Sequence, residues 1–280
     1  TFKAVTLGAG LATGRISPST TVDVGPEWQL YDGILRDSHP DPGVKTATEA
    51  LRMSSNIGVA KLAYEHLSTS GSRDSILAKW IGRFGFGAPT GIDLPGEVAG
   101  IVPAYKDWSG TSPLNIPIGH GIATTPIQIA QLYATIANGG IQTTPHLVTR
   151  IDGQGPVGLK QQRIMPTRAA NTLAGMLEGV VSDQGTASAA QIPGYSVAGK
   201  TGTTKKIDKD GTYSDNRYLA WFVGFAPVKN PRVLTLIMVD QPRGGQYYGG
   251  EVAGPAFAKL TERALIALGV QQDRPDTAAE

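Results

Sequence analysis

The residues Ser196-Val197-Ala198-Gly199-Lys200-Thr201-Gly202-Thr203 are the first of three segments that set the architecture of this chain. Two apolar segments follow, YLAWFVGFAP at residues 218–227 and RVLTLIMVD at residues 232–240. Both are short, rich in β-branched and aromatic residues, and bounded by turn formers, which is typical of buried strands. A polar loop, KKIDKDGTYSDN at residues 205–216, precedes them. We therefore predict a three-stranded antiparallel meander with residues 200–203 on an edge strand.

Helical patterns occur on both sides of these strands. The clearest is TPIQIAQLYATIAN at residues 125–138, which has proline near its start and Gly139-Gly140 after its end, the usual placement of these residues around a helix. A second pattern begins with the capping pair Thr46 and Glu49. Further helices are predicted over residues 1–13, 57–67, 73–85, 167–182 and 252–268. Together these elements predict an α+β fold, with an antiparallel sheet flanked by helices and an all-helical subdomain.

The remaining chain is rich in turn-forming residues. Residues 20–45 predict loops and hairpins, and residues 86–118 predict a long surface segment punctuated by glycine and proline. A chain of 280 residues, 40% hydrophobic and 17% charged, is globular and long enough for one large domain. We assign residues 1–270 to that domain and residues 271–280 to a flexible C-terminal tail.

Composition excludes several classes of function. Lys and Arg total 25 against 23 for Asp and Glu, with no long block of either sign, so no nucleic-acid partner is expected. Without cysteine the chain can form neither disulfides nor thiolate-ligated zinc sites. The histidines lack metal-ligand spacing, so we expect no metal and no cofactor. His120, between two glycines, is assigned no catalytic role. The four histidines are His39, His66, His120 and His146.

The first residues, Thr1 to Leu7, have the pattern of a helix interior and not that of a signal peptide. No run approaches the roughly 20 apolar residues that a membrane-spanning helix needs. We expect the sequence to begin inside a domain, with any anchor or targeting segment upstream.

Three short motifs occur in an informative order: x-x-Lys at residues 1–3, Ser-x-Asn at residues 54–56, and Lys-Thr-Gly at residues 200–202. Together they resemble the Ser-x-x-Lys, Ser-x-Asn and Lys-[Ser/Thr]-Gly set of penicillin-binding proteins and serine β-lactamases. The resemblance runs from Thr1 to about Val270. The segments GHGIATTPIQIAQLYATIANGG, YLAWFVGFAP and YYGGEVAGPAFAKL are similar to those of class B penicillin-binding proteins, the transpeptidases specific to division or elongation.

Lys3 is the candidate general base. Residues three apart on a helix share one face, so Lys3 can serve a serine immediately before Thr1, where the resemblance places the nucleophile. Such a serine could be modified, acylated or lost by truncation. An amine acts as a base near neutral pH only if its pKa is lowered, and burial or a second cation such as Lys200 would lower it.

Ser54 and Asn56 lie at a predicted junction of two helices. There the Ser54 hydroxyl can relay a proton and the Asn56 amide can orient a substrate amide. Helix capping is the alternative interpretation, because serine and asparagine are preferred caps.

Lys200, Thr201, Gly202 and Thr203 lie on the predicted edge strand. Gly202 leaves room for a substrate to pair with the backbone, while the hydroxyls and the Lys200 ammonium can bind a carboxylate. The backbone N–H of Thr203 can contribute to an oxyanion hole. A surface turn that happens to contain a lysine is the alternative.

Tyr247 and Tyr248 fall where the resemblance places aromatic residues beside the substrate pocket; core packing explains them equally well. The resemblance further implies a peptidoglycan D,D-transpeptidase that cross-links D-Ala-D-Ala stem peptides outside the cytoplasm. It implies an upstream transmembrane anchor, covalent inhibition by β-lactams, and a membrane-embedded glycan polymerase as partner in a division or elongation complex. Two alternatives remain: a serine β-lactamase, and a β-lactam-sensing or non-catalytic binding domain.

Overall fold

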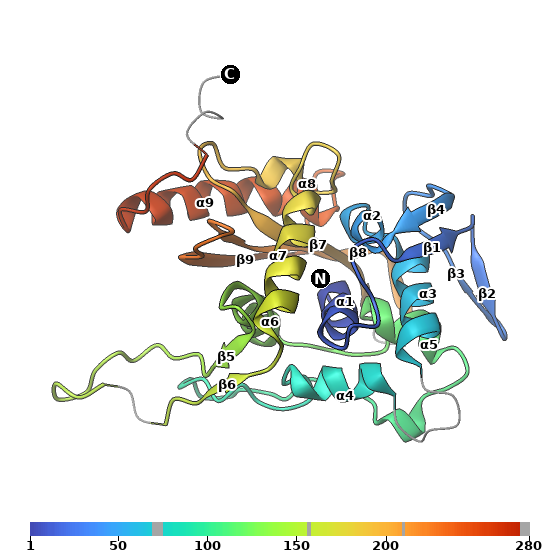
Figure 1. Cartoon of the computed structure of the whole chain (residues 1–280), viewed down its shortest axis with the longest axis horizontal. Coiled ribbons are helices and arrows are strands. Elements are labelled where there is room, and N and C mark those ends of the chain that lie inside the picture. Colours follow the sequence, from blue (N-terminus) through green and yellow to red (C-terminus); the bar gives the residue numbers. More distant parts are fainter. Residues whose placement is uncertain (69–74, 156–157, 209–210, 275–280) are drawn as a thin grey trace. The chain divides into compact units, whose positions relative to one another are not determined.

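The computed structural model describes residues 1–68, 75–155, 158–208 and 211–274 (Figure 1). The chain separates into two compact units. Residues 2–173 form the first, which we call the helical unit. Thr1 together with the residues from Ala174 onward forms the second, which we call the sheet unit. Each unit is described by itself.

Helix α1, Lys3–Ala12, runs through the core of the helical unit. Every residue from Lys3 to Gly10 is buried, and the helix packs against α3 (Asn56–Leu67), α4 (Ile76–Arg83) and η2 (Ile116–Ile118). The helix predicted over residues 1–13 is thus confirmed. The helix predicted over residues 73–85 is shorter, and its first two residues lie outside the described part of the chain. A functional group on α1 is therefore held rigidly and away from water.

The predicted capping pair is present at the start of α2, Ala47–Arg52. The Thr46 hydroxyl accepts a hydrogen bond from the Glu49 amide (3.2 Å), and the Glu49 carboxylate accepts one from the Thr46 amide (2.7 Å). Helix α6, Pro126–Ala137, begins with the same arrangement between Thr125 and Gln128. Each reciprocal pair satisfies two amide groups that the first turn of a helix leaves without partners.

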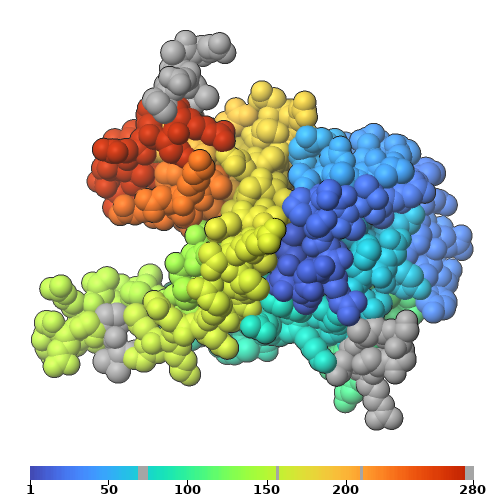
Figure 2. All heavy atoms as spheres, viewed as in Figure 1, coloured from blue at the N-terminus to red at the C-terminus, as the bar shows by residue number. Residues whose placement is uncertain are grey.

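Among the described residues of the helical unit there are also three small antiparallel sheets. Strand β1 (Thr21–Val24) pairs with β4 (Gly43–Thr46), and β2 (Trp28–Leu30) forms a hairpin with β3 (Gly33–Leu35). The loops and hairpins predicted over residues 20–45 are confirmed. Strand β5 (Ile141–Thr143) pairs with β6 (Gln161–Arg163), and residues 144–155, which follow β5, project from the rest of this unit (Figures 1 and 2).

The prediction that residues 86–118 lie wholly on the surface is wrong at their C-terminal end. The segment contains η1 (Tyr105–Asp107), α5 (Ser112–Asn115) and η2, and Leu114 and all of η2 are buried. The Pro117 carbonyl oxygen accepts a hydrogen bond from the buried Thr6 hydroxyl at 2.7 Å. Glycine and proline mark turns in a sequence, but they do not show whether the turn packs against the core.

The sheet unit contains the predicted meander. Strands β7 (Ala198–Ile207), β8 (Tyr213–Ala226) and β9 (Val233–Asp240) are antiparallel neighbours in the order β7-β8-β9. The predicted polar loop is shorter than expected, because β7 continues to Ile207 and β8 begins at Tyr213. Backbone pairing continues there through exposed polar residues, since ladder hydrogen bonds do not depend on the side chain. β7 lies at an edge of this sheet.

Helices cover the sheet. Helix α9 (Gly254–Ala267) packs against β8 and β9, with the Phe257 and Phe222 rings 4.6 Å apart in an edge-to-face contact. The helix predicted over residues 252–268 corresponds to α9, and a separate short helix, α8 (Gly249–Val252), precedes it. Pro255 lies in the first turn of α9, where a residue without an amide hydrogen starts a helix better than it continues one. Helix α7, Thr167–Val180, contains the boundary between the two units.

The described part of the predicted tail is hydrogen bonded to the sheet unit. The Asp273 carboxylate accepts from the Ser196 amide (2.8 Å), and the Arg274 amide donates to the Gly194 carbonyl (3.0 Å). Residues 275–280 of that tail lie outside the described residues. Among the helices that the structure describes, none is both long enough and apolar enough to span a bilayer.

Candidate active site

Two of the three sequence motifs meet inside the helical unit. The Lys3 ammonium on α1 donates hydrogen bonds to the Ser54 carbonyl oxygen at 2.5 Å and to the Ser54 hydroxyl at 3.0 Å. The two residues are 51 positions apart, and the packing of α1 against α3 brings them together. A buried amine with a serine hydroxyl beside it can exchange a proton with that hydroxyl.

Burial changes the pKa of the Lys3 amine. Desolvation lowers the pKa of Lys3 from its ordinary 10.5 to about 8, and the negative charge of Asp37 opposes this shift. An amine with that pKa is neutral in roughly one molecule in ten at pH 7, whereas an ordinary lysine is almost wholly protonated. Lys3 therefore has the property that a general base needs near neutral pH.

Ser54 occupies a strained turn between α2 and α3. Its backbone φ is 58°, a left-handed conformation that L-residues with a side chain rarely adopt. The Ser54 amide donates to the Leu51 carbonyl at 3.1 Å, which holds the turn to the end of α2. Helix capping, the alternative considered for this motif, is performed by Ser55, whose hydroxyl accepts from the Gly58 amide at 2.8 Å.

Asn56 is the first residue of α3, as predicted for a residue at a helix junction. Its side-chain amide donates to the Arg36 carbonyl oxygen at 3.1 Å, and its backbone amide donates to the Asp37 carboxylate. The side chain is half-buried and is oriented by a segment 20 residues earlier in the chain.

Sequence reasoning missed Asp37. This residue follows β3 and accepts hydrogen bonds from the Ser55 hydroxyl and from the Asn56 and Ile57 amides. Its position in a turn-rich stretch carries no local signal, because the pairing depends on the path of the loop that brings it to the helix junction. A family alignment would be needed to find such a residue without a structure.

The Lys-Thr-Gly motif lies in the sheet unit, on β7. Lys200 is fully buried, and its ammonium donates to the Thr201 hydroxyl at 3.0 Å. The Thr201 hydroxyl also lies 3.2 Å from that of Thr186. The Thr203 hydroxyl accepts from the Gly249 amide at 2.9 Å. These contacts place two hydroxyls and a buried cation on one edge strand, a combination suited to a carboxylate.

Gly202 is required by packing. A Cβ atom at this position would lie 1.8 Å from Trp221 Nε1, because the two residues are cross-strand partners on β7 and β8. A Cβ at Gly249 would lie 2.2 Å from the Trp221 carbonyl oxygen and 2.5 Å from that of Gly202. The segment that begins α8 therefore approaches the β7–β8 pair closely, and only glycine permits this.

Tyr247 and Tyr248 form a half-exposed aromatic stack. The Tyr247 ring is 4.3 Å from that of Tyr218 on β8, at an interplanar angle of 16°, and 4.6 Å from that of Tyr248. The hydrogen bond between the Tyr247 and Tyr248 hydroxyls raises the pKa of Tyr248. Tyr247 and Tyr248 are both half-buried, so part of each side chain is accessible to an apolar part of a ligand.

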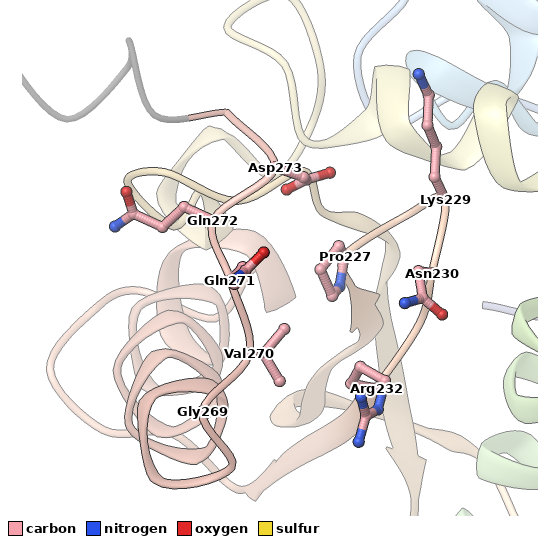
Figure 3. A pocket seen from close by; sticks show the side chains of 9 residues that line it. All are labelled: Pro227, Lys229, Asn230, Arg232, Gly269, Val270, Gln271, Gln272 and Asp273. Carbon is pink, nitrogen blue, oxygen red and sulfur yellow. The ribbon is translucent and has the colours of Figure 1, made fainter.

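Three further features lie outside the motif residues. His120 follows η2, and desolvation, then the charge of Lys3, lower its pKa below 6.5. Within the described ranges, no three His, Asp or Glu residues are grouped as metal ligands. A hollow of about 440 Å³ in the sheet unit is bounded by the β8–β9 turn and residues 269–273, and the Lys229 side chain extends away from that segment (Figure 3). It shares no residue with the motifs.

A buried lysine beside a serine hydroxyl, a Ser-x-Asn turn and a Lys-Thr-Gly edge strand, on an α+β fold, define the class of penicillin-binding proteins and serine β-lactamases. A family model described as the penicillin-binding protein transpeptidase domain matches residues 1–262. The chain belongs to that family.

Similar proteins and solved structures support the same family. The chain is 33% identical to a probable peptidoglycan D,D-transpeptidase, PbpC, of Pseudomonas aeruginosa, over 97% of this chain and 46% of that protein. It is 36% identical to FtsI of Escherichia coli, over 81% of this chain and 37% of that protein. It thus spans less than half the length of these relatives. The TP domain of penicillin-binding protein 3 of Burkholderia pseudomallei has a TM-score of 0.86 at 32% identity, covering 98% of this chain and 80% of that one.

Proposed function

We propose that this chain is the catalytic part of a peptidoglycan D,D-transpeptidase. The observation that carries the proposal is the buried Lys3 amine, with a pKa of about 8, hydrogen bonded to the Ser54 hydroxyl. The names of the curated relatives, which are peptidoglycan D,D-transpeptidases, support the same reaction. The substrate would be the D-Ala-D-Ala end of a peptidoglycan stem peptide.

In the proposed reaction a serine immediately before Thr1 is the nucleophile. Its oxygen attacks the carbonyl carbon of the penultimate D-Ala, and its proton passes to Lys3. The C–N bond to the terminal D-Ala then breaks, and the leaving amine takes a proton through Ser54 and Lys200. An amine of a second stem attacks the resulting ester, releases the serine and completes the cross-link.

The remaining motif residues would bind the substrate. Thr201 and Thr203 are suited to the terminal carboxylate, and Asn56 to a substrate amide. The Thr203 backbone N–H would stabilise the oxyanion that forms on the attacked carbonyl, together with the N–H of the nucleophilic serine. Gly202 belongs to the same strand, and Tyr247 with Tyr248 would contact an apolar part of the substrate.

β-Lactams would acylate the same serine. Penicillin-binding protein 3 of Mycobacterium tuberculosis, 31% identical to this chain, has been solved in complexes with ampicillin and with aztreonam. We further propose that the whole protein acts outside the cytoplasm, is anchored by an upstream transmembrane helix, and works with a membrane-embedded glycan polymerase in division or elongation.

A fluorescent penicillin tests the assignment in the full-length protein, which includes the residue immediately before Thr1. Lys3→Ala and Lys200→Ala should abolish labelling, while Lys259→Ala, an exposed lysine on α9, should leave it unchanged. Normal labelling of either motif variant would overturn the roles assigned to these lysines. Rapid turnover of penicillin by the parent chain would instead indicate a β-lactamase. Labelling without cross-linking of stem peptides would indicate a sensor.

A further inference from the structure

We propose that Asp37 is a positioning residue for this reaction: its carboxylate holds the Ser54–Asn56 turn in place beside Lys3, and its charge acts on the Lys3 amine. The inference rests on the proposed function and extends it to a residue outside the three motifs.

The Asp37 carboxylate binds the turn with both oxygens. One oxygen accepts from the Ser55 hydroxyl at 2.6 Å, and the other accepts from the Asn56 amide and from the Ile57 amide, the latter at 3.0 Å. The adjacent Arg36 carbonyl holds the Asn56 side chain. Residues 36 and 37 together therefore fix the backbone of the Ser-x-Asn motif and its asparagine side chain.

The hydrogen bonds from Asp37 hold the residues that directly follow Ser54, at the start of α3. From the α2 side the turn is held by the Ser54 amide on Leu51 (3.1 Å) and by the Ser55 amide on the Ala50 carbonyl (2.8 Å). The left-handed backbone at Ser54 persists only if its surroundings determine it on both sides. Without Asp37 the α3 side would lose three hydrogen bonds, and the two oxygens of Ser54 that Lys3 contacts would lose their fixed direction.

Asp37 also acts on Lys3 through its charge, raising the lysine pKa against the effect of burial. Within the described helical unit, the other titratable group coupled to Lys3 is His120, whose pKa lies below 6.5. It is neutral in the pH range where Lys3 titrates. Arg36 is exposed and paired with Glu27 at 2.5 Å. Burial is the larger influence on the Lys3 pKa, and the charge of Asp37 opposes it.

Substitutions can separate the effect of the Asp37 hydrogen bonds from the effect of its charge. Asp37→Asn keeps the size of the side chain and an oxygen for the amides but removes the charge. Ser55→Ala removes one hydrogen bond of the clamp and the cap of α3, yet keeps the charge. Asp41→Asn is the matched control, because Asp41 lies in the same loop and its carboxylate pairs with Lys45 at 2.6 Å.

The test measures the rate at which a fluorescent penicillin acylates the full-length protein, which includes the residue before Thr1, from about pH 5 to about pH 10. The rate should rise with pH as Lys3 becomes neutral. Asp37→Asn should move this rise to lower pH by at least about half a unit and slow acylation at its plateau by about tenfold. Ser55→Ala should slow acylation without moving the rise, and Asp41→Asn should change neither.

An NMR titration of Lys3 in the chain with labelled lysine gives the second measurement. The pKa of Lys3 should fall in Asp37→Asn by the same number of pH units as the shift in the pH at which the acylation rate rises. An unchanged pKa and an unmoved profile would overturn the proposal and leave Asp37 as a helix cap. If the parent chain is not acylated at all, the proposed function fails, while the titration still decides the action of Asp37 on Lys3. If Asp37→Asn does not fold, Asp37→Glu keeps the charge but displaces it, and full-rate acylation by that variant would also overturn the proposal.

Discussion

Replacing Lys3 with methionine should remove part of the increase in the free energy of unfolding that the parent chain shows as the pH rises above about 8. The pKa of Lys3 is about 8 in the folded protein against an ordinary 10.5, so the folded state holds this proton less tightly than the unfolded state by about 2.5 pH units. Each unit corresponds to about 1.4 kcal/mol. Below pH 8 both states are protonated, and the charge destabilises the fold by about 3 kcal/mol.

The direction follows from the protons bound in each state. Between about pH 8 and pH 10.5 the folded protein has lost the Lys3 proton and the unfolded chain still binds it. The free energy of unfolding of the parent chain should therefore rise with pH in this window, relative to Lys3→Met, which has no amine to titrate. Between pH 7 and pH 10.5 the difference between the two proteins should change by about 3 kcal/mol in favour of the parent.

Urea denaturation followed by circular dichroism, at several pH values from 7 to about 10.5, measures this change. Comparing the two proteins at each pH cancels the titration of all other groups. Hydrogen bonds lost with the amine shift the difference by a similar amount at every pH and do not alter its slope. Lys259→Met, at an exposed site, should show no such slope. A constant difference between Lys3→Met and the parent chain would refute a lowered pKa at Lys3.

Two further substitutions test the geometry of the motifs. Gly202→Ala should destabilise the sheet unit by about 1–3 kcal/mol, because its Cβ would overlap Trp221; thermal unfolding measures this, and an unchanged melting temperature would contradict the close contact. Ser54→Gly should be about 1 kcal/mol more stable than Ser54→Ala, because glycine adopts a φ of 58° without strain, and both should acylate poorly. Equal stability of the two would show that the left-handed turn is absent in solution.

Much of the fold was predictable from local patterns. The meander followed from two apolar segments with strand-like composition, and the starts of α2 and α6 followed from capping residues and a first-turn proline. Such features depend on neighbours within a few residues, so a single sequence contains them. The buried α5–η2 segment was not predictable, since its glycine and proline residues indicate turns wherever the turns lie.

The candidate site divides in the same way. The identities and order of Lys3, Ser54, Asn56 and the Lys200–Thr203 strand, and their resemblance to a known family, were determined by the sequence alone. The pKa of Lys3 and the clamp by Asp37 were not, because burial and hydrogen bonding between residues 18 to 51 positions apart depend on the packing of distant segments. The sequence alone identifies the side chains proposed to carry the chemistry. The tertiary structure determines the pKa of Lys3 and the orientation of the Ser54–Asn56 turn, because both depend on packing between distant segments.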